Sequence, residues 1–184
     1  RSLHFLSIFW LSISLSANSP VLNKDSITHP EVGLEGMVVT QHYLASEVGE
    51  AILNKGGNAY DATIAVAFAL AVVLPRAGNI GGGGFTVLYN SSDESFQSLD
   101  YREKAPLAAS KNMYLDKNGD VISNLSTLGY KAIAVPGTVD GMWELHKKYG
   151  SMDWKELIVP SIKLAKEGFK AVSYTHLTLP TILL

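Results

Sequence analysis

Residues 78–89 read GNIGGGGFTVLY, and this stretch decides the fold that the sequence predicts. Its four consecutive glycines lie between an apolar segment rich in Ala and Val, residues 62–74, and an apolar run with β-propensity. A phosphate-binding loop has the opposite order, with a strand before the glycines and a helix after them. No Lys-Ser or Lys-Thr pair follows Gly84 either, so the glycine run does not match a phosphate-binding loop. Because glycine lacks a Cβ, we expect the run to pack backbone closely against backbone.

The segments around this stretch predict a mixed α/β domain in which helices pack on sheet layers. The strand and helix patterns do not alternate strictly, which argues against a parallel sheet built from βαβ units. The predicted strands are residues 36–40, 85–90 and 96–102. The predicted helices are residues 42–55, 62–74, 138–148 and 154–167.

Two of these helices carry more specific predictions. Residues 62–74 contain no charged side chain, so we expect that helix to be buried on all sides. Asn58 is expected to cap its start, and Asp61 is well placed against the positive end of the helix dipole. In the last helix, Pro160 predicts a kink or a break near Val159, because proline lacks the N–H that a helix interior needs.

The composition limits the classes of function. The chain has 184 residues, of which 47% are hydrophobic and 17% charged, so it is too apolar for disorder and suits one domain or part of a larger one. A net charge of −2 provides no basic field for nucleic acid or an anionic membrane. Without cysteine the chain has no disulfide, no thiolate metal site and no cysteine nucleophile. The five histidines form no metal-binding pattern, and we expect neither a metal nor an organic cofactor.

The first residues resemble an export signal. Residues 1–17 carry a positive charge, a short apolar run and then small residues, which predicts export to the periplasm or the outside of the cell. The run is too short to span a bilayer as a stable helix, and the alternatives are a buried helix or a signal-anchor. The polar residues 18–35 predict a linker to the main body, residues 36–172.

The last residues, 173–184, do not continue the pattern of the body. They contain no charge and no helical period, and they resemble the translated sequencing-adaptor tails found on some predicted proteins. We therefore treat this segment as non-native in the fold prediction. The alternative is a real strand.

Arg102 is the best candidate for a functional residue. It follows a predicted strand, and a guanidinium group can hold a carboxylate through two parallel hydrogen bonds. From residue chemistry alone, a structural ion pair with a neighbouring acidic residue is the alternative, because Asp100 and Glu103 flank it. Glu103 is expected either to orient Arg102 or to be a surface charge.

Five segments, in this order along the chain, resemble the start of the large subunit of the γ-glutamyltranspeptidases, which are N-terminal-nucleophile hydrolases. The similarity covers about three quarters of this chain but only the first part of a typical family member. The matching segments are residues 56–62 (GGNAYDA), 78–85 (GNIGGGGF), 101–106 (YREKAP), 135–141 (VPGTVDG) and 160–165 (PSIKLA).

The resemblance implies an αββα sandwich, incomplete in this chain, and a precursor that cuts itself into a large and a small subunit. It implies that the N-terminal threonine of the small subunit attacks the γ-glutamyl amide of compounds such as glutathione, giving glutamate and cysteinylglycine. Arg102 then matches the arginine that binds the α-carboxylate of the γ-glutamyl group. Asp61 and Glu103 match residues to which we assign only supporting roles.

The chain departs from the family in one respect. No segment matches the junction that carries the threonine nucleophile, or the glycine pair of the oxyanion site, so the resemblance implies no catalytic residue within these 184 residues. We expect residues 1–184 alone to be inactive. The alternatives are a related cephalosporin or glutaryl acylase, and a non-catalytic protein that has kept only the γ-glutamyl-binding arginine.

Overall fold

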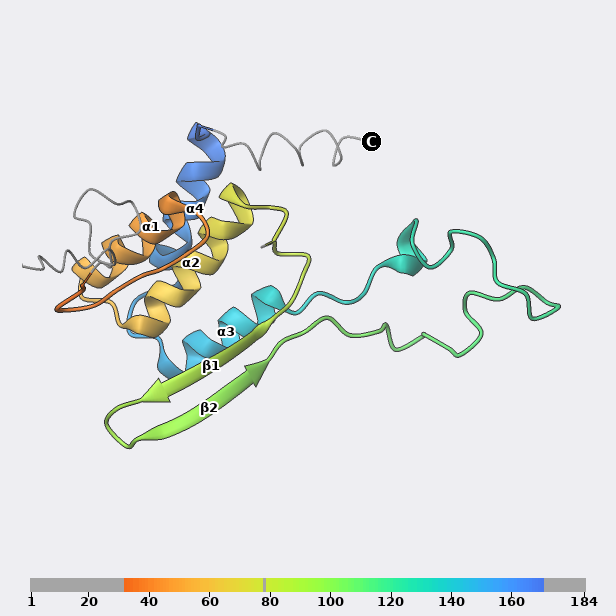
Figure 1. Ribbon diagram of the computed structural model, residues 1–184, viewed down its shortest axis with the longest axis horizontal. Helices are drawn as coiled ribbons and strands as arrows, with labels where there is room; N and C mark the ends of the chain where they lie inside the picture. Colours follow the sequence, from red (N-terminus) through yellow and green to blue (C-terminus); the bar gives the residue numbers. More distant parts are fainter. Residues whose placement is uncertain (1–31, 78, 171–184) are drawn as a thin grey trace, which may run out of the picture. The chain divides into compact units, whose positions relative to one another are not determined.

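The computed structural model describes residues 32–77 and 79–170. The chain divides into two units, Arg1–Glu35 and Gly36–Leu184, and all helices and strands that are described belong to the second unit (Figure 1). The predicted export signal, residues 1–17, and the predicted non-native tail, residues 173–184, lie outside the described residues.

Four α-helices form where helical periodicity predicts them, and local capping sets their ends. His42 caps the first helix through Nδ1, which accepts from the backbone N–H of Leu44, and Gly56 follows that helix in the left-handed region with a φ of 90°. Asn58 and Asp61 form a reciprocal capping box at the start of the second helix. The helices are α1 (Tyr43–Asn54), α2 (Ala59–Val73), α3 (Thr138–Tyr149) and α4 (Trp154–Glu167).

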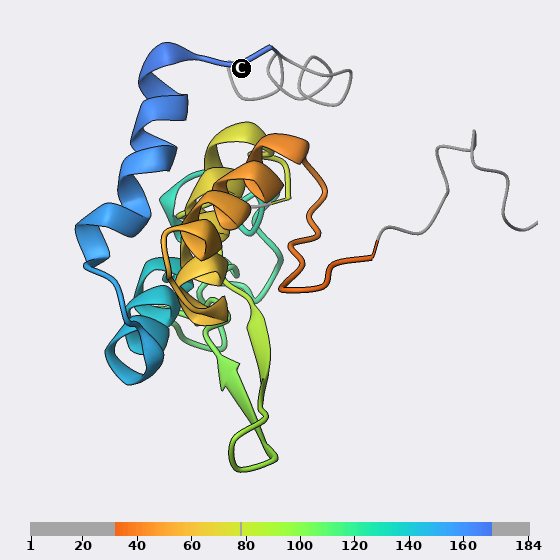
Figure 2. The same cartoon turned by 90° about the vertical axis from the view of Figure 1, so that its left-hand side faces the viewer.

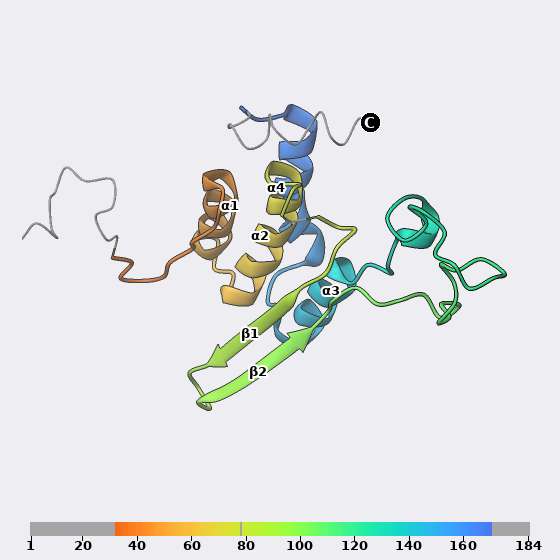
Figure 3. The same cartoon turned by 45° about the vertical axis from the view of Figure 1, so that its right-hand side comes forward.

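One antiparallel hairpin forms where two strands are predicted. Strand β1 (Phe85–Asn90) pairs with β2 (Ser95–Asp100) along their whole length, from Phe85 opposite Asp100 to Asn90 opposite Ser95. The mixed helix and strand class is therefore confirmed, although the only sheet within residues 32–77 and 79–170 has two strands. Helix α3 packs beside β2, and the hairpin extends past it (Figures 1 and 3).

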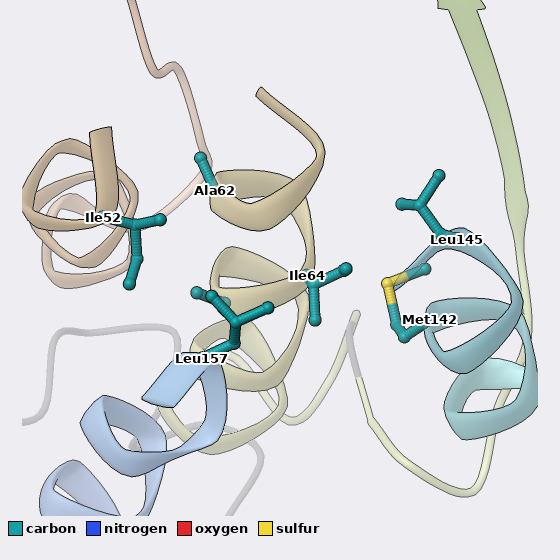
Figure 4. Close-up of a cluster of buried hydrophobic side chains, with 7 residues drawn as sticks. Ile52, Ala62, Ile64, Met142, Leu145 and Leu157 are labelled. Carbon is teal, nitrogen blue, oxygen red and sulfur yellow. The ribbon is translucent and has the colours of Figure 1, made fainter. Parts of the chain in front are cut away.

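The hydrophobic core surrounds α2, which packs against α1, α3 and α4. Burying these aliphatic side chains supplies the main driving force for folding. Figure 4 shows the larger of two buried clusters, in which α2 meets the other three helices through Ile52, Ala62, Ile64, Ala65, Met142, Leu145 and Leu157. A smaller cluster joins α2 to α1 through Ala45, Ala69 and Val73.

The prediction that α2 is buried on all sides is wrong. Thr63 is exposed, and Val66 and Leu70 are only half-buried. Three helices leave part of the α2 surface open, because each helix covers only one side of a neighbour. The uncharged residues 62–74 therefore include positions that the described residues do not bury.

One further prediction about local structure is wrong, and a second is wrong in part. Residues 36–40, which lead into α1 (Figure 2), do not form a strand and have no strand partner among the described residues. The Val38 side chain instead lies against Gly49 of α1. The predicted break at Pro160 does not occur, because α4 continues to Glu167, and the predicted kink stays a prediction. A proline removes one N–H, and the buried Leu157 and Ser161 on either side keep the helix packed on α2.

The connection from β2 to α3 is long and mostly exposed (Figures 1 and 3). Its two ends are joined by an isolated bridge between Lys104 and Val135, and it contains a single 3-10 turn, Tyr130–Ala132. None of the helices within residues 32–77 and 79–170 is long and apolar enough to cross a membrane.

Candidate functional site

Arg102 lies two residues beyond the end of β2, on a segment that is held at both ends. The backbone N–H of Tyr101 donates to the carbonyl of Gly84 at 3.0 Å, which continues the hairpin ladder by one bond. On the other side, Lys104 and Val135 exchange two backbone hydrogen bonds, at 3.2 Å and 2.8 Å. Arg102 itself donates its backbone N–H to the Asp100 carboxylate at 2.9 Å. A backbone fixed in this way gives the Arg102 side chain a defined origin.

Close packing of glycine against this segment explains the sequence that surrounds it. A Cβ placed on Gly83 would lie 2.6 Å from the carbonyl oxygen of Tyr101, and one on Gly137 would lie 1.9 Å from the same atom. Neither position tolerates a side chain without moving the backbone. The predicted role of the glycine run is confirmed at Gly83. Residues 81–84 are not among the glycines with positive φ, so backbone conformation does not explain the run, and at Gly83 the reason for glycine is the lack of room for a Cβ.

The glycine run also holds the start of α3. The carbonyl oxygen of Gly82 accepts from the backbone N–H groups of Gly137 and Thr138, at 2.9 Å and 3.0 Å. These N–H groups belong to the first turn of α3, where no intrahelical carbonyl is available to them. Three of the five family-like segments, residues 78–85, 101–106 and 135–141, therefore meet around the backbone of Tyr101 and Arg102.

A cavity of about 190 Å³ lies between the end of β2 with residues 101–104 and residues 135–144 at the start of α3. Arg102 is on its wall and is exposed to solvent. Among the described residues, the other charged side chains that line the cavity are Asp100, Lys104, Asp140 and Glu144. An exposed guanidinium on a rigid segment presents its N–H donors to any carboxylate that enters the cavity.

Glu103 is not paired with Arg102 here. The ion pairs within residues 32–77 and 79–170 are Lys147–Glu144 and Lys163–Glu167, both between exposed side chains. The Glu103 side chain lies toward the glycine run instead, with Oε1 at 3.4 Å from the position that a Cβ on Gly82 would take. The alternative of a structural ion pair for Arg102 with Glu103 is therefore not what the described residues show.

Asp61 lies in a different environment, within the helical core. Its side chain is 0% exposed and accepts hydrogen bonds from the backbone N–H groups of Asn58, Ser151 and Met152 and from the Ser151 hydroxyl. Burial by itself raises the pKa of the Asp61 carboxyl. The hydrogen bonds, of which the one from the Ser151 side chain is the strongest, outweigh burial and hold the pKa below its ordinary value of 3.8.

This carboxylate joins the start of α2 to the loop between α3 and α4. The prediction for Asp61, at the positive end of its helix, is confirmed by the capping box. The sequence did not indicate Ser151, its partner from 90 positions away, because no short-range pattern links the two residues. The sequence also did not indicate that Tyr101 packs against Gly141, although both residues lie within family-like segments. No group of three or more His, Cys, Asp or Glu side chains in the described ranges is placed to hold a metal ion.

Comparison with known proteins gives consistent matches. The family model described as gamma-glutamyltranspeptidase matches residues 45–181. The glutathione hydrolase proenzyme of Pseudomonas sp. (strain A14) is 51% identical over 158 residues, which make up 85% of this chain and 27% of that protein. The crystal structure of Helicobacter pylori gamma-glutamyltranspeptidase matches with 49% identity and a TM-score of 0.77, over 83% of this chain and 43% of that chain.

A more distant match bears on the choice of activity. The crystal structure of cephalosporin acylase from Bacillus halodurans matches with 25% identity and a TM-score of 0.66, over 88% of this chain and 32% of that chain. In all these comparisons the matched part of the other protein is limited. The chain spans about a quarter of the length of the curated relatives that it matches.

Proposed function

Because this chain belongs to the gamma-glutamyltranspeptidase family, we propose that it is the first part of the large subunit of a glutathione hydrolase. The proposed enzyme cleaves γ-glutamyl amides such as glutathione and passes the glutamyl group to water or to an acceptor amine. Several relatives are named proenzymes, which supports a precursor that is cut into a large and a small subunit. The small subunit is then the partner of this chain.

The observation that carries the proposal is the exposed guanidinium of Arg102 on a fixed backbone at the wall of a cavity. A γ-glutamyl donor has a free α-carboxylate, and a planar guanidinium recognises a carboxylate through two parallel hydrogen bonds. In the proposed complex Arg102 holds the amino-acid end of the donor. Glu103 supports the segment from the side of the glycine run.

The bond-breaking step belongs to a residue outside this chain. In the proposed reaction a threonine hydroxyl, activated by its own α-amine, attacks the γ-carbonyl carbon of the donor and forms an ester. The amide nitrogen leaves as an amine after it takes a proton. Water, or the amine of an acceptor, then attacks the ester carbonyl and frees the threonine. These 184 residues supply donor binding but no nucleophile, so we propose that they are inactive alone.

The same proposal includes the location. The pattern of residues 1–17 supports export to the periplasm or beyond the cell. These residues lie outside the described part of the chain, so the support comes from their sequence. Secretion of a fusion that carries residues 1–35 in front of a reporter enzyme tests this part separately.

A second candidate activity follows from the match to a cephalosporin acylase. Such an enzyme shares the architecture but acts on a different acyl group. The identities favour the first proposal, because the match to the acylase is 25% and the match to the glutathione hydrolase proenzyme is 51%. A third possibility is a protein that binds γ-glutamyl compounds without cleaving them.

One experiment separates these activities. The complete reading frame and residues 1–184 are expressed side by side, and each is assayed with γ-glutamyl-p-nitroanilide, glutathione and a glutaryl amide that lacks the α-amino and α-carboxyl groups. The proposal predicts cleavage of the first two substrates by the complete protein and no cleavage by residues 1–184. A preference for the glutaryl amide would identify an acylase, and binding without turnover would identify the non-catalytic protein. Release of glutamate by residues 1–184 would disprove the assignment of the nucleophile.

A further inference from the structure

Tyr101 precedes Arg102, and its ring is held between two glycines from different elements. A Cβ on Gly84, at the start of the hairpin, would lie 3.0 Å from Cε2 and Oη of the ring. A Cβ on Gly141, in the first turns of α3, would lie 2.3 Å from the ring atom Cγ and 2.5 Å from the Tyr101 Cβ. Real Cβ atoms do not approach other atoms as closely as 2.3 Å, so the ring can lie here only because residue 141 is glycine. At Gly84 a Cβ would make a tight contact, and the ring would have to shift by a few tenths of an ångström.

The ring and the backbone of this residue are held by two glycine pairs. Gly84 and Gly141 contact the ring, while Gly83 and Gly137 contact the carbonyl that joins Tyr101 to Arg102. In each pair one glycine precedes or begins β1 and the other lies at the start of α3. The Tyr101 hydroxyl accepts a hydrogen bond from Thr86 Oγ1 at 3.3 Å, which is a long bond and adds little. Packing therefore holds the ring more than polar contact does.

From this arrangement we infer that Tyr101 is a positioning residue for Arg102. The ring, wedged between Gly84 and Gly141, fixes the Cα from which the guanidinium reaches the cavity wall. The inference rests on the proposed function, because it concerns how Arg102 is aimed at the donor carboxylate. Arg102 is exposed and has no ion pair within the described residues, so its own side-chain contacts do not fix its direction. Its direction therefore depends on its backbone, which the packed Tyr101 ring fixes together with the hydrogen bonds of Tyr101, Arg102 and Lys104.

Removing the Tyr101 ring is expected to affect substrate affinity more than turnover. A shift of about 1 Å in a group that positions the substrate can cost about 10²-fold in rate or affinity. If Tyr101 aims Arg102, removing the ring raises the KM of donors that carry an α-carboxylate. A donor whose α-carboxylate has been converted to a primary amide has lost the charge that Arg102 recognises, so its KM changes much less. A purely structural role would lower the amount of active enzyme without this distinction between donors.

The experiment uses the complete proenzyme, with active sites counted by burst titration, and compares γ-glutamyl-p-nitroanilide with its α-carboxamide. Tyr101→Ala and Gly141→Ala are expected to raise the KM of the carboxylate donor about tenfold or more, with kcat per active site changed less than about threefold. Tyr101→Phe keeps the ring, so its KM for the carboxylate donor is expected to stay within about twofold of the parent value.

A matched control comes from Gly57, in the turn between α1 and α2. A Cβ there would lie 2.7 Å from Ile52 Cγ2 and 2.7 Å from Met152 Sδ, so Gly57→Ala strains the core about as severely, away from the cavity. It is expected to lower thermal stability and to leave both KM values unchanged. If Gly141→Ala does not fold, Tyr101→Ala, which removes atoms, gives the deciding KM.

The outcomes separate this inference from the proposed function. Equal KM changes for the two donors in Tyr101→Ala, or no change in either, would overturn the positioning role. Arg102→Gln is measured in parallel. If Arg102→Gln leaves the KM of the carboxylate donor unchanged, the proposed role of Arg102 fails. If Arg102→Gln raises that KM and Tyr101→Ala does not, only the positioning inference fails.

Discussion

Asp61 and Arg102 are both charged residues of family-like segments, and their surroundings differ completely. Asp61 is 0% exposed and accepts hydrogen bonds from Asn58, at the start of its own helix, and from Ser151, 90 positions away. Arg102 is exposed, and within residues 32–77 and 79–170 it takes part in no ion pair. A buried charge with satisfied partners contributes to stability, whereas an exposed charge on a rigid segment is available to a ligand. Membership in a motif does not separate these two roles, but burial and partners do.

The largest expected effect is the loss of stability when the buried carboxylate of Asp61 is removed. Asp61→Ala leaves the N–H groups of Asn58, Ser151 and Met152 without their acceptor inside the core. Each orphaned buried donor costs about 1–3 kcal/mol, so we expect the free energy of unfolding to fall by about 3–5 kcal/mol. Urea unfolding of the chain, followed by far-UV circular dichroism, measures the change. A loss below about 1 kcal/mol would show that water replaces the carboxylate and that the residue is not structural.

Replacing the exposed Arg102 is expected to weaken donor binding and to leave stability almost unchanged. Arg102→Gln should change the free energy of unfolding by less than about 0.5 kcal/mol, because nothing described in the structure depends on its side chain. In the complete proenzyme it should raise the KM of γ-glutamyl donors by about 10- to 100-fold, which corresponds to the loss of a charged, bidentate contact. Arg102→Lys keeps the charge but not the planar fork, so we expect it to recover only part of this loss. Steady-state kinetics and thermal melts of the same preparations decide the point.

The buried Asp61 also predicts a response of stability to pH. The pKa of the Asp61 carboxyl is lowered in the folded chain from an ordinary 3.8, so its contribution to stability is complete above pH 3.8 and is lost as the pH falls through the folded pKa. Hydrogen bonds from Ser95 hold the pKa of Asp93 low, and those from the Asp120 and Asn118 backbone do the same for Asp116.

Asp61→Asn isolates the contribution of the buried carboxyl. The variant retains Asp93 and Asp116, so the difference between its pH–stability curve and that of the parent belongs to Asp61. We expect that difference to be constant near neutral pH and to shrink as the solution becomes more acidic than pH 3.8. Urea midpoints measured between pH 2 and pH 7 give the two curves. A difference that grows toward acid would mean that the Asp61 carboxyl is protonated in the folded chain.

Much of the fold and part of the candidate site could be predicted from the sequence. The helices and the hairpin follow from apolar periodicity and from caps such as Asn58 and Asp153, which are signals within one turn of chain. Arg102 was found as a candidate because an arginine after a strand has a recognisable chemistry. The place of Asp61 at the start of its helix was predicted, but its bond to Ser151 was not, because that bond joins residues 90 positions apart.

The wrong predictions share a physical cause. A strand needs a partner, and the β-rich residues 36–40 have none in the described chain, so β-propensity alone does not produce a strand there. A helix without charge predicts complete burial, yet Thr63 and Val66 of α2 remain accessible because three neighbours do not enclose it. Pro160 predicts a kink or a break, and the break does not occur where Leu157 and Ser161 are buried on either side of it. In each case tertiary contacts, or their absence, decide against the local signal.

The smallest expected effect concerns Glu103, which is adjacent to Arg102 but is not paired with it. An interaction between exposed charges is worth about 0.2–1 kcal/mol, so Glu103→Gln should raise the KM of a γ-glutamyl donor by no more than about fivefold and should leave stability unchanged. The measurement is the ratio of its KM to that of Arg102→Gln in the complete proenzyme. If the two variants lose equal affinity, Glu103 pairs with Arg102 once the donor is bound. In that case Glu103 would act together with Arg102 in donor binding. Exposure in the unliganded chain would then no longer be enough to separate residues that bind the donor from residues that stabilise the fold.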